Sequence, residues 1–140
     1  MGDENPSIIS HVSVGTDDLG RAAAFYDRVL GALGCRRVEE LAAGIGYGKR
    51  HPEFWVQMPL DGRPTSVGNG AHVAFLAASR EAVHAFHAAA LAAGAADEGA
   101  PGPRPHYGAP YYGCFVRDPD GHKIEAMVWD ESLAHAPEAG

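Results

Sequence analysis

"HVSVGTDDLGRAAAFYDRVLGAL", residues 11–33, returns in altered form at residues 72–94 as "HVAFLAASREAVHAFHAAALAAG". At this offset of 61 residues the copies share the initial His-Val pair, an Ala-Phe pair and a later leucine. Each copy is a short alternating run, a polar break and then an amphipathic stretch. This order predicts a strand followed by a helix, and it predicts that unit twice.

The ends of both expected helices are marked in the sequence. Asp17 or Asp18 precedes the first amphipathic stretch and Ser79 precedes the second. Side-chain oxygens of these residue types accept hydrogen bonds from free N–H groups of a first helical turn. Glycines follow at Gly34 and Gly94, where a helix commonly ends. We therefore expect two capped helices of similar length.

A second alignment, at an offset of 68 residues, covers the chain after each helix. It sets "GYGKRHPEFWVQM" over "CFVRDPDGHKIEAM" and places Gln57 opposite Glu125. The larger offset implies about seven extra residues in the second copy, and the Pro/Gly/Tyr-rich segment 98–113 supplies them. Neither a helix nor a central strand is expected to hold this segment, so it is predicted to be a long loop. The last two strands of the second copy are expected to join at the turn Asp118–Gly121.

One helix cannot cover both faces of a curved sheet, so neither half of the chain can close its own core. The sequence predicts an α+β fold of two βαβββ repeats, whose curved mixed sheets form a cup with the helices outside. We expect a single domain over residues 1–140, with one repeat at about 8–60 and the other at about 70–130. The tail, residues 131–140, is expected to fray.

Composition narrows the classes of partner. The chain has 140 residues, 11 basic and 18 acidic, and a formal net charge of −7. No run of Lys or Arg could follow a phosphate backbone, so nucleic acid is not an expected partner. No apolar stretch is long enough to cross a bilayer, and the polar N-terminus does not have the pattern of a secretory signal. A soluble cytoplasmic protein is predicted, with Cys35 and Cys114 as packing residues.

Strand alternation places three potential metal ligands on one surface. The apolar residues that alternate with His11 and His72 belong under the helices, so both histidines should face into the cup. Glu125 alternates with Ile124 and Ala126 and should face the same way. Two imidazoles and a carboxylate suit Fe(II), Mn, Ni, Co or Zn, and a cation would offset the cost of burying the glutamate.

The alternative is that these histidines are hydrogen-bonded structural residues, since the chain has eight histidines. Their equivalent positions in the repeat favour the metal site. Surface, helix or loop positions are expected for the other six: His51, His84, His87, His106, His122 and His135.

Aromatic and amide side chains are expected at the rim of the cup, where they could bind a small-molecule substrate. The candidates are Trp55, Gln57, Tyr107, Tyr111 and Tyr112. The alternative for Tyr111 and Tyr112 is that they only anchor the predicted loop over the sheet. Trp129 is expected to pack in the core or at the rim.

Three segments, "HVSVGTDDLGRAAAFYDRVLGALG", "GAHVAF" and "FVRDPDGHKIEAM", resemble the vicinal oxygen chelate superfamily of glyoxalases, bleomycin-resistance proteins and extradiol dioxygenases. The resemblance runs from about Ile8 to Trp129. It implies that His11, His72 and Glu125 match the family's metal-ligand positions. Glyoxalase I members use a fourth ligand, usually glutamate, on the last strand of the first half. The repeat places Gln57 there, so standard glyoxalase I chemistry is not expected.

The resemblance leaves several functions open. It favours a divalent-metal-dependent enzyme, of the lyase/isomerase or dioxygenase type, that acts on a small oxygenated metabolite. The alternative is a metal-free drug- or metabolite-binding protein like those of the bleomycin-resistance branch. A third possibility is a dimer that keeps the ligands as relics. Because superfamily members commonly pair, the resemblance also implies a homodimer.

Overall fold

A computed structural model describes residues 5–134 of the chain. The first half contains β1 (Val12–Gly15), α1 (Leu19–Gly31), β2 (Arg36–Leu41), β3 (Gly44–Gly48) and β4 (Phe54–Gln57). The second half contains β5 (His72–Leu76), α2 (Arg80–Ala92), β6 (Ala96–Pro103), a 3₁₀ turn (Pro105–Tyr107), β7 (Tyr111–Arg117), β8 (Lys123–Trp129) and α3 (Glu131–Ala134).

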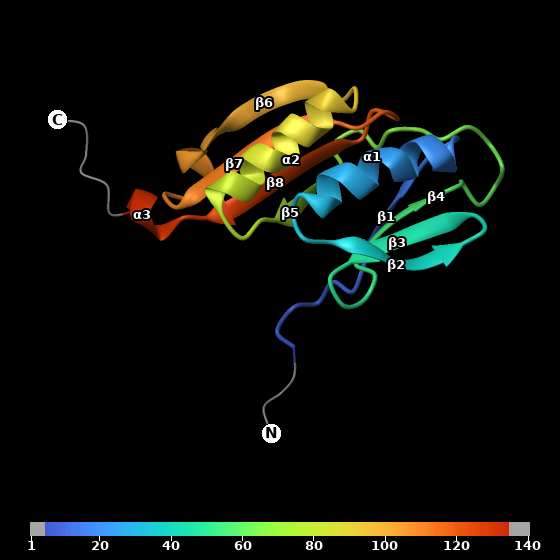
Figure 1. Cartoon of the computed structure of the whole chain (residues 1–140), viewed down its shortest axis with the longest axis horizontal. Coiled ribbons are helices and arrows are strands. Elements are labelled where there is room, and N and C mark those ends of the chain that lie inside the picture. Colours follow the sequence, from blue (N-terminus) through green and yellow to red (C-terminus); the bar gives the residue numbers. More distant parts are fainter. Residues whose placement is uncertain (1–4, 135–140) are drawn as a thin grey trace.

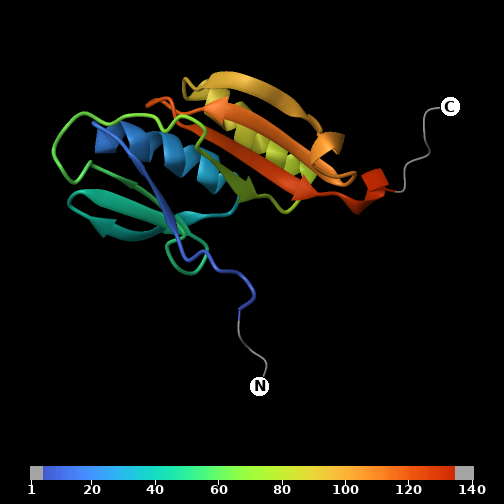
Figure 2. The same cartoon turned by 180° about the vertical axis from the view of Figure 1, so that it is seen from behind.

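The two halves have the same topology, so the predicted α+β fold of two βαβββ repeats is confirmed. Their sheets have the strand orders β1-β4-β3-β2 and β5-β8-β7-β6. In each sheet the first strand pairs with the last in parallel, and the other pairs are antiparallel. The sheets are separate, and α1 and α2 lie together on the same side of them (Figure 1). Seen from behind, both sheets show their other face (Figure 2).

Both helices begin and end where the sequence predicts. The side chain of Asp18 accepts a hydrogen bond from the backbone N–H of Arg21, and Ser79 accepts one from Ala82. Gly34 and Gly94 follow the helices with φ of +83° and +93°. Only glycine adopts this left-handed conformation without strain, which explains why each helix stops there.

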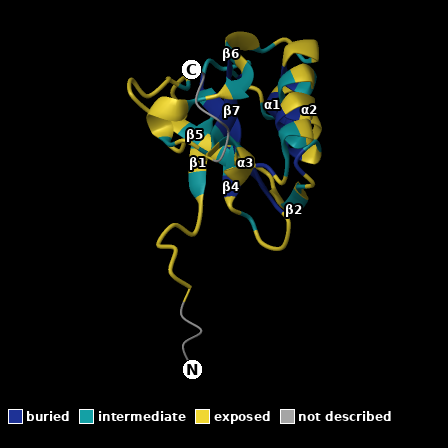
Figure 3. Ribbon diagram, turned by 90° about the vertical axis from the view of Figure 1, so that its left-hand side faces the viewer, coloured by how far each residue is buried: buried dark blue, intermediate teal, exposed yellow. Residues whose placement is uncertain are grey.

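A single core joins the two halves on the helix side of the sheets (Figure 3). Val12 and Val14 of β1 pack against it, as do Val73 and Phe75 of β5, in agreement with the predicted alternation. The Phe75 ring meets Phe54 of the other sheet edge to face, with ring centroids 5.0 Å apart. The opposite faces of the sheets are therefore left for side chains that the core does not need.

Polar contacts also hold the halves together. The Tyr26 hydroxyl of α1 donates to Asp118 Oδ2 in the turn between β7 and β8, with an O–O distance of 2.5 Å. Burial, and then the Asp118 charge, raise the pKa of Tyr26 well above its usual value. Arg21 pairs with Asp120 of the same turn at 2.8 Å. His122 Nε2 donates to the Gly15 carbonyl oxygen at 2.7 Å. These bonds fix the orientation of the halves within one chain.

Most of the predicted long loop, residues 98–113, is not a loop. Its first part belongs to β6, an edge strand whose pairing with β7 shifts register between Asp97 and Gly99 and again between Gly99 and Gly102. Prolines are tolerated at edges and bulges because their missing N–H breaks no ladder there. The tail that was expected to fray begins with α3, and residues 135–140 lie outside the described part.

No helix in the described part of the chain is long and apolar enough to cross a membrane.

Candidate metal and ligand site

Glu125 lies at the centre of the second sheet, on the face that points away from the helices. Its neighbours along β8, Ile124 and Ala126, are buried in the core, so the carboxylate points the other way. It is nevertheless only 1% exposed. Glu125 Oε1 lies 3.1 Å from His72 Nε2 on the adjacent strand β5. Two of the three predicted metal ligands are thus already in contact.

The second oxygen of this carboxylate is held by a tyrosine. The Tyr111 hydroxyl donates to Glu125 Oε2 at 2.6 Å. Burial, followed by the hydrogen bond and charge of Glu125, raises the pKa of Tyr111 above its usual value. Gly113 leaves the necessary space, because a Cβ there would lie 3.3 Å from Glu125 Oε2 and 3.1 Å from the Ala126 carbonyl oxygen. The site thus fixes the orientation of the glutamate.

Aromatic rings continue from Tyr111 along this face. The Tyr107 ring centroid is 5.1 Å from that of Tyr111 and 6.5 Å from that of Phe115. Trp129 meets Tyr111 edge to face at 5.0 Å. Tyr107 and Trp129 are about half exposed, so they form an open wall beside Glu125 that a planar ligand could contact.

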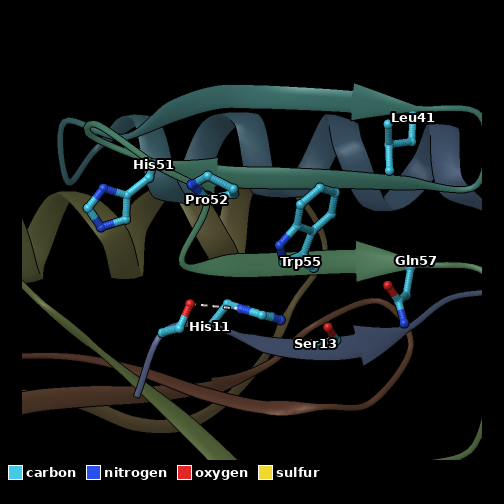
Figure 4. Close-up of a pocket in the computed structure, with 8 residues that line it drawn as sticks. His11, Ser13, Leu41, His51, Pro52, Trp55 and Gln57 are labelled. Atoms are coloured by element: carbon cyan, nitrogen blue, oxygen red, sulfur yellow. Dashed lines mark hydrogen bonds between the residues drawn. The ribbon is translucent and has the colours of Figure 1, made fainter. Parts of the chain in front are cut away.

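The first half carries a pocket of about 510 Å³ on its own exposed sheet face (Figure 4). His11 stands above β1, and Trp55 and Gln57 project from β4 on the same side. The His11 Nδ1 atom and the Ser10 hydroxyl are 3.0 Å apart and hydrogen bonded. The other lining residues are Ser10, Ser13, Leu41, His51 and Pro52.

One chain does not gather the three predicted ligands. His72 and Glu125 meet, but His11 lines the pocket of the other half. Within residues 5–134 there is no group of three or more His, Cys, Asp or Glu side chains placed to hold a metal ion. The pair of His72 and Glu125 suits a divalent cation, because an imidazole nitrogen and a carboxylate oxygen converge there. Within the described residues these two side chains have no third potential ligand beside them.

The position equivalent to Glu125 in the first half was predicted to be Gln57, and this is wrong. Ala74, which matches Ser13 in the repeat, pairs with Glu125 in the ladder between β5 and β8. Ser13 pairs with Trp55 in the ladder between β1 and β4. Trp55 therefore occupies the equivalent position, and Gln57 lies two residues beyond it on the same face. The alignment failed because the offset changes by two more residues before the last strand.

Tyr112 is also not where the sequence predicted. It faces the helix layer, where its hydroxyl lies 2.7 Å from His84 Nε2 of α2. The Arg80 guanidinium lies 4.7 Å from the centre of its ring. Because successive strand residues face opposite ways, Tyr111 and Tyr112 could not both line the cup.

Sequence reasoning missed three residues near the two histidines. His51 lines the first pocket from a loop, for which the sequence gives no signal. Lys123 and Arg117 lie beside His72 on the second sheet. Lys123 precedes Glu125 by two residues, so strand alternation alone already placed both on one face.

The sequence profile of the Glyoxalase/Bleomycin resistance protein/Dioxygenase superfamily matches residues 8–126 of the chain. The chain belongs to this superfamily. No match is found among curated proteins.

Solved structures agree with this assignment. A glyoxalase/bleomycin resistance protein from Albidiferax ferrireducens is 40% identical, with a TM-score of 0.77, over 87% of this chain and 98% of that one. A lactoylglutathione lyase from Agrobacterium tumefaciens is 23% identical, with a TM-score of 0.63, over 89% of this chain and 96% of that one. At that identity, the second likeness concerns the fold alone.

Proposed function

We propose that the protein is a divalent-metal-dependent enzyme that acts on a small oxygenated molecule, and that it works as a homodimer. The contact between His72 Nε2 and Glu125 Oε1 carries this proposal. Both side chains occupy the face that the core leaves free, and Tyr111 holds the glutamate from the other side. A buried carboxylate oriented in this way is suited to a cation. Superfamily membership adds support, because its members generally bind divalent metals.

The dimer would supply the third ligand. His11 lies on the first half, and the polar contacts of Tyr26 and Asp118 fix that half relative to the second. A second copy can place its own His11 against His72 and Glu125 while these polar contacts within each chain stay intact. In a dimer with twofold symmetry this contact occurs twice, which gives two identical sites.

Exposed apolar side chains on the free faces support such pairing. Leu76 of β5 is 71% exposed and Trp129 of β8 is 51% exposed. Leu41 of β2 and Met58, just after β4, are also exposed. β1 and β5 are edge strands with unpaired backbone groups along one side. Contact between copies would remove this apolar surface from water.

The residues would then have separate tasks. His11, His72 and Glu125 would hold the metal, which when bound polarises an oxygen atom of the substrate. Tyr111 keeps the Glu125 carboxylate in one orientation. Trp55, with Tyr107 and Trp129, offers flat apolar surface to the substrate. Gln57 can hydrogen bond to a polar substituent at the end of the first pocket.

Trp55 bears on the choice of reaction. It stands where the repeat would put a second carboxylate, and indole cannot accept a proton as a general base. We therefore do not extend standard glyoxalase I chemistry to this chain, although one structural neighbour is named a lactoylglutathione lyase. Another lyase or isomerase reaction, or a dioxygenase reaction, fits the three remaining ligands.

Metal content tests the proposal. The protein, purified without chelator, should contain about one divalent ion per chain, measured by mass spectrometry of the elements. His72→Ala, Glu125→Gln and His11→Ala should each lose most of it. His51→Ala is the matched control, because His51 lines the same pocket as His11 but is not a proposed ligand. A wild-type protein that stays metal-free when saturated with each candidate ion would refute the proposal.

The alternative is a metal-free drug- or metabolite-binding protein. The first pocket favours it, because Leu41, Pro52 and Trp55 give it apolar walls and no carboxylate lines it. Under this alternative a planar apolar ligand would quench Trp55 fluorescence equally in the wild type and in Glu125→Gln. Metal-dependent quenching that Glu125→Gln abolishes would favour the enzyme.

A further inference from the structure

A second pocket, of about 400 Å³, lies beside His72 at the beginning of β5. One wall is the Gly- and Asn-containing segment 67–71, and the other is formed by Arg117 of β7 and Lys123 of β8. Its remaining lining residue is His72, so the pocket adjoins the proposed metal ligands directly. No carboxylate lines it.

The backbone register brings Lys123 next to His72. The two residues are ladder partners in β5 and β8, and Lys123 shares its face with Glu125. Its ammonium lies 5.2 Å from the centre of the Phe115 ring. Within residues 5–134 no carboxylate lies in ion-pair distance of Lys123. The more distant Glu98 interacts with it electrostatically, and most of the Lys123 charge is available to a ligand.

Arg117 is placed differently. Its Nε donates to Glu98 Oε1 at 2.5 Å, and Nη1 donates to the Gly121 carbonyl oxygen at 3.1 Å. These bonds hold the guanidinium at the pocket wall. Glu98 offsets part of its charge, so Arg117 adds less to anion binding than Lys123 does.

We propose that this pocket binds the anionic group of the substrate, a carboxylate or a phosphate, with Lys123 as its principal partner. The substrate class is then a small oxygenated anion, whose charged end lies in this pocket and whose oxygens reach His72 and Glu125. The assignment rests on the proposed function for the reaction, but anion binding itself needs no metal. The chain as a whole carries −7, so a local cationic pocket counters the general repulsion of anions.

The competing explanation is structural. Lys123 could serve only to cover the Phe115 ring through a cation–π contact. In that case anions would not alter its environment, and its neutral replacement would change stability but not anion affinity. The two explanations therefore make different predictions.

The chain has only two lysines, Lys49 and Lys123, which makes a direct test possible. Wild-type protein treated with chelator is acetylated with a limiting reagent, and each lysine is followed by peptide mass spectrometry. The probes are inorganic phosphate and malonate, with neutral malonamide as the uncharged control. Exposed Lys49, just after β3, is the internal reference.

We expect an anion at ten times its dissociation constant to slow acetylation of Lys123 about tenfold, while Lys49 and the malonamide arm stay unchanged. At equal concentrations of the two anions, stronger protection by phosphate than by malonate would identify a phosphate group, and the reverse a carboxylate. Calorimetry should show at least a tenfold weaker affinity in Lys123→Gln and no change in Lys49→Gln. Equal acetylation of Lys123 with and without both anions would overturn the proposal.

This outcome is separable from that of the metal experiment. Protection of Lys123 in a protein that never binds metal would support the anion pocket and refute the metalloenzyme. A protein that binds metal but whose Lys123 is not protected by either anion would support the metalloenzyme and refute the anion pocket. Thermal unfolding of Lys123→Gln checks that its fold is intact.

Discussion

The contact between Tyr111 and Glu125 is the most specific feature of the site. A glutamate on a strand face is ordinary, but one that is 1% exposed has to be compensated. His72 and Tyr111 each bond one of its oxygens, so neither oxygen remains unsatisfied. Tyr111 is therefore placed to orient the Glu125 carboxylate, and its contact with a substrate stays a prediction.

Tyr111→Phe tests this role. Loss of the hydroxyl leaves Glu125 Oε2 without its partner, so metal affinity should fall about tenfold or more, as for other residues that orient a ligand. The metal-free protein should lose about 1–3 kcal/mol of unfolding free energy, because a buried acceptor is left unsatisfied. Metal titration and urea unfolding measure the two effects.

The matched control is Tyr107→Phe, which removes a hydroxyl from the neighbouring ring without touching Glu125. It should alter neither the metal affinity nor the unfolding free energy. Equal metal affinity in Tyr111→Phe and the wild type would show that the hydroxyl does not position the glutamate.

Single positions were predictable where only strand alternation was needed. His72, Glu125 and their core-facing neighbours obey a period of two, so the sequence suffices. Which residue of the first half is equivalent to Glu125 depends on the register between strands that are distant in the sequence, so the assignment of Gln57 failed. Hydrogen bonding between β1 and β4 sets that register, and the repeat does not reveal it.

Helix α1 is joined to its own sheet by a charged contact. Asp27 accepts two hydrogen bonds from the Arg37 guanidinium, at 2.8 and 2.7 Å, and one from the Tyr47 hydroxyl at 2.8 Å. The Arg37 hydrogen bond, with help from Tyr47, lowers the pKa of Asp27 below its usual value, although burial opposes this. The ionised form is thus the one that stabilises the fold.

Asp27→Asn should therefore destabilise the protein in a pH-dependent way. Its stabilising contribution is complete above the unfolded carboxyl pKa of about 4 and disappears as the pH falls through the lower folded value. At pH 7 we expect a loss of about 1 kcal/mol or less, because the pair is partly exposed to water. The difference from wild type should vanish near pH 2, in urea unfolding at several pH values.

Glu39→Gln is the control, since Glu39 is exposed on β2 and makes none of these bonds. It should unfold like the wild type at every pH. A stability difference for Asp27→Asn that persists unchanged at pH 2 would mean that the charge of Asp27 is not its source.

The elements differ in how far their sequences define them. Both helices carry a cap, an apolar stripe and a terminal glycine, so local information places their ends. β6 carries none of the usual strand signals, because it contains two prolines and two glycines. Its pairing with β7, a long-range contact, makes it a strand.

The whole molecule shows why the repeat predicts the fold but not the complete site. The apolar pattern requires two halves with a shared core, and the structure has that core. The same pattern contains no information on which halves come together through the sheet faces that the core leaves free. In one chain His11 is apart from His72 and Glu125, so the repeat alone does not show how the three predicted ligands could meet.

Mixing two inactive variants distinguishes a site shared between copies from one within a chain. His11→Ala breaks the first half and Glu125→Gln breaks the second, so neither homodimer has an intact site. In the mixed dimer one site loses both residues, but the other combines an intact first half with an intact second half. With random exchange, half of the dimers are mixed and about a quarter of all sites should regain metal.

Metal content after unfolding the two variants together and refolding them measures this recovery. The control mixture combines His72→Ala with Glu125→Gln, which damage the same half, so no arrangement can restore a site. If each chain built its own site, the first mixture would recover no more metal than the control. Recovery in the first mixture alone requires that every site be made from two chains, because only pairing between the first half of one copy and the second half of the other brings an intact His11 to an intact Glu125.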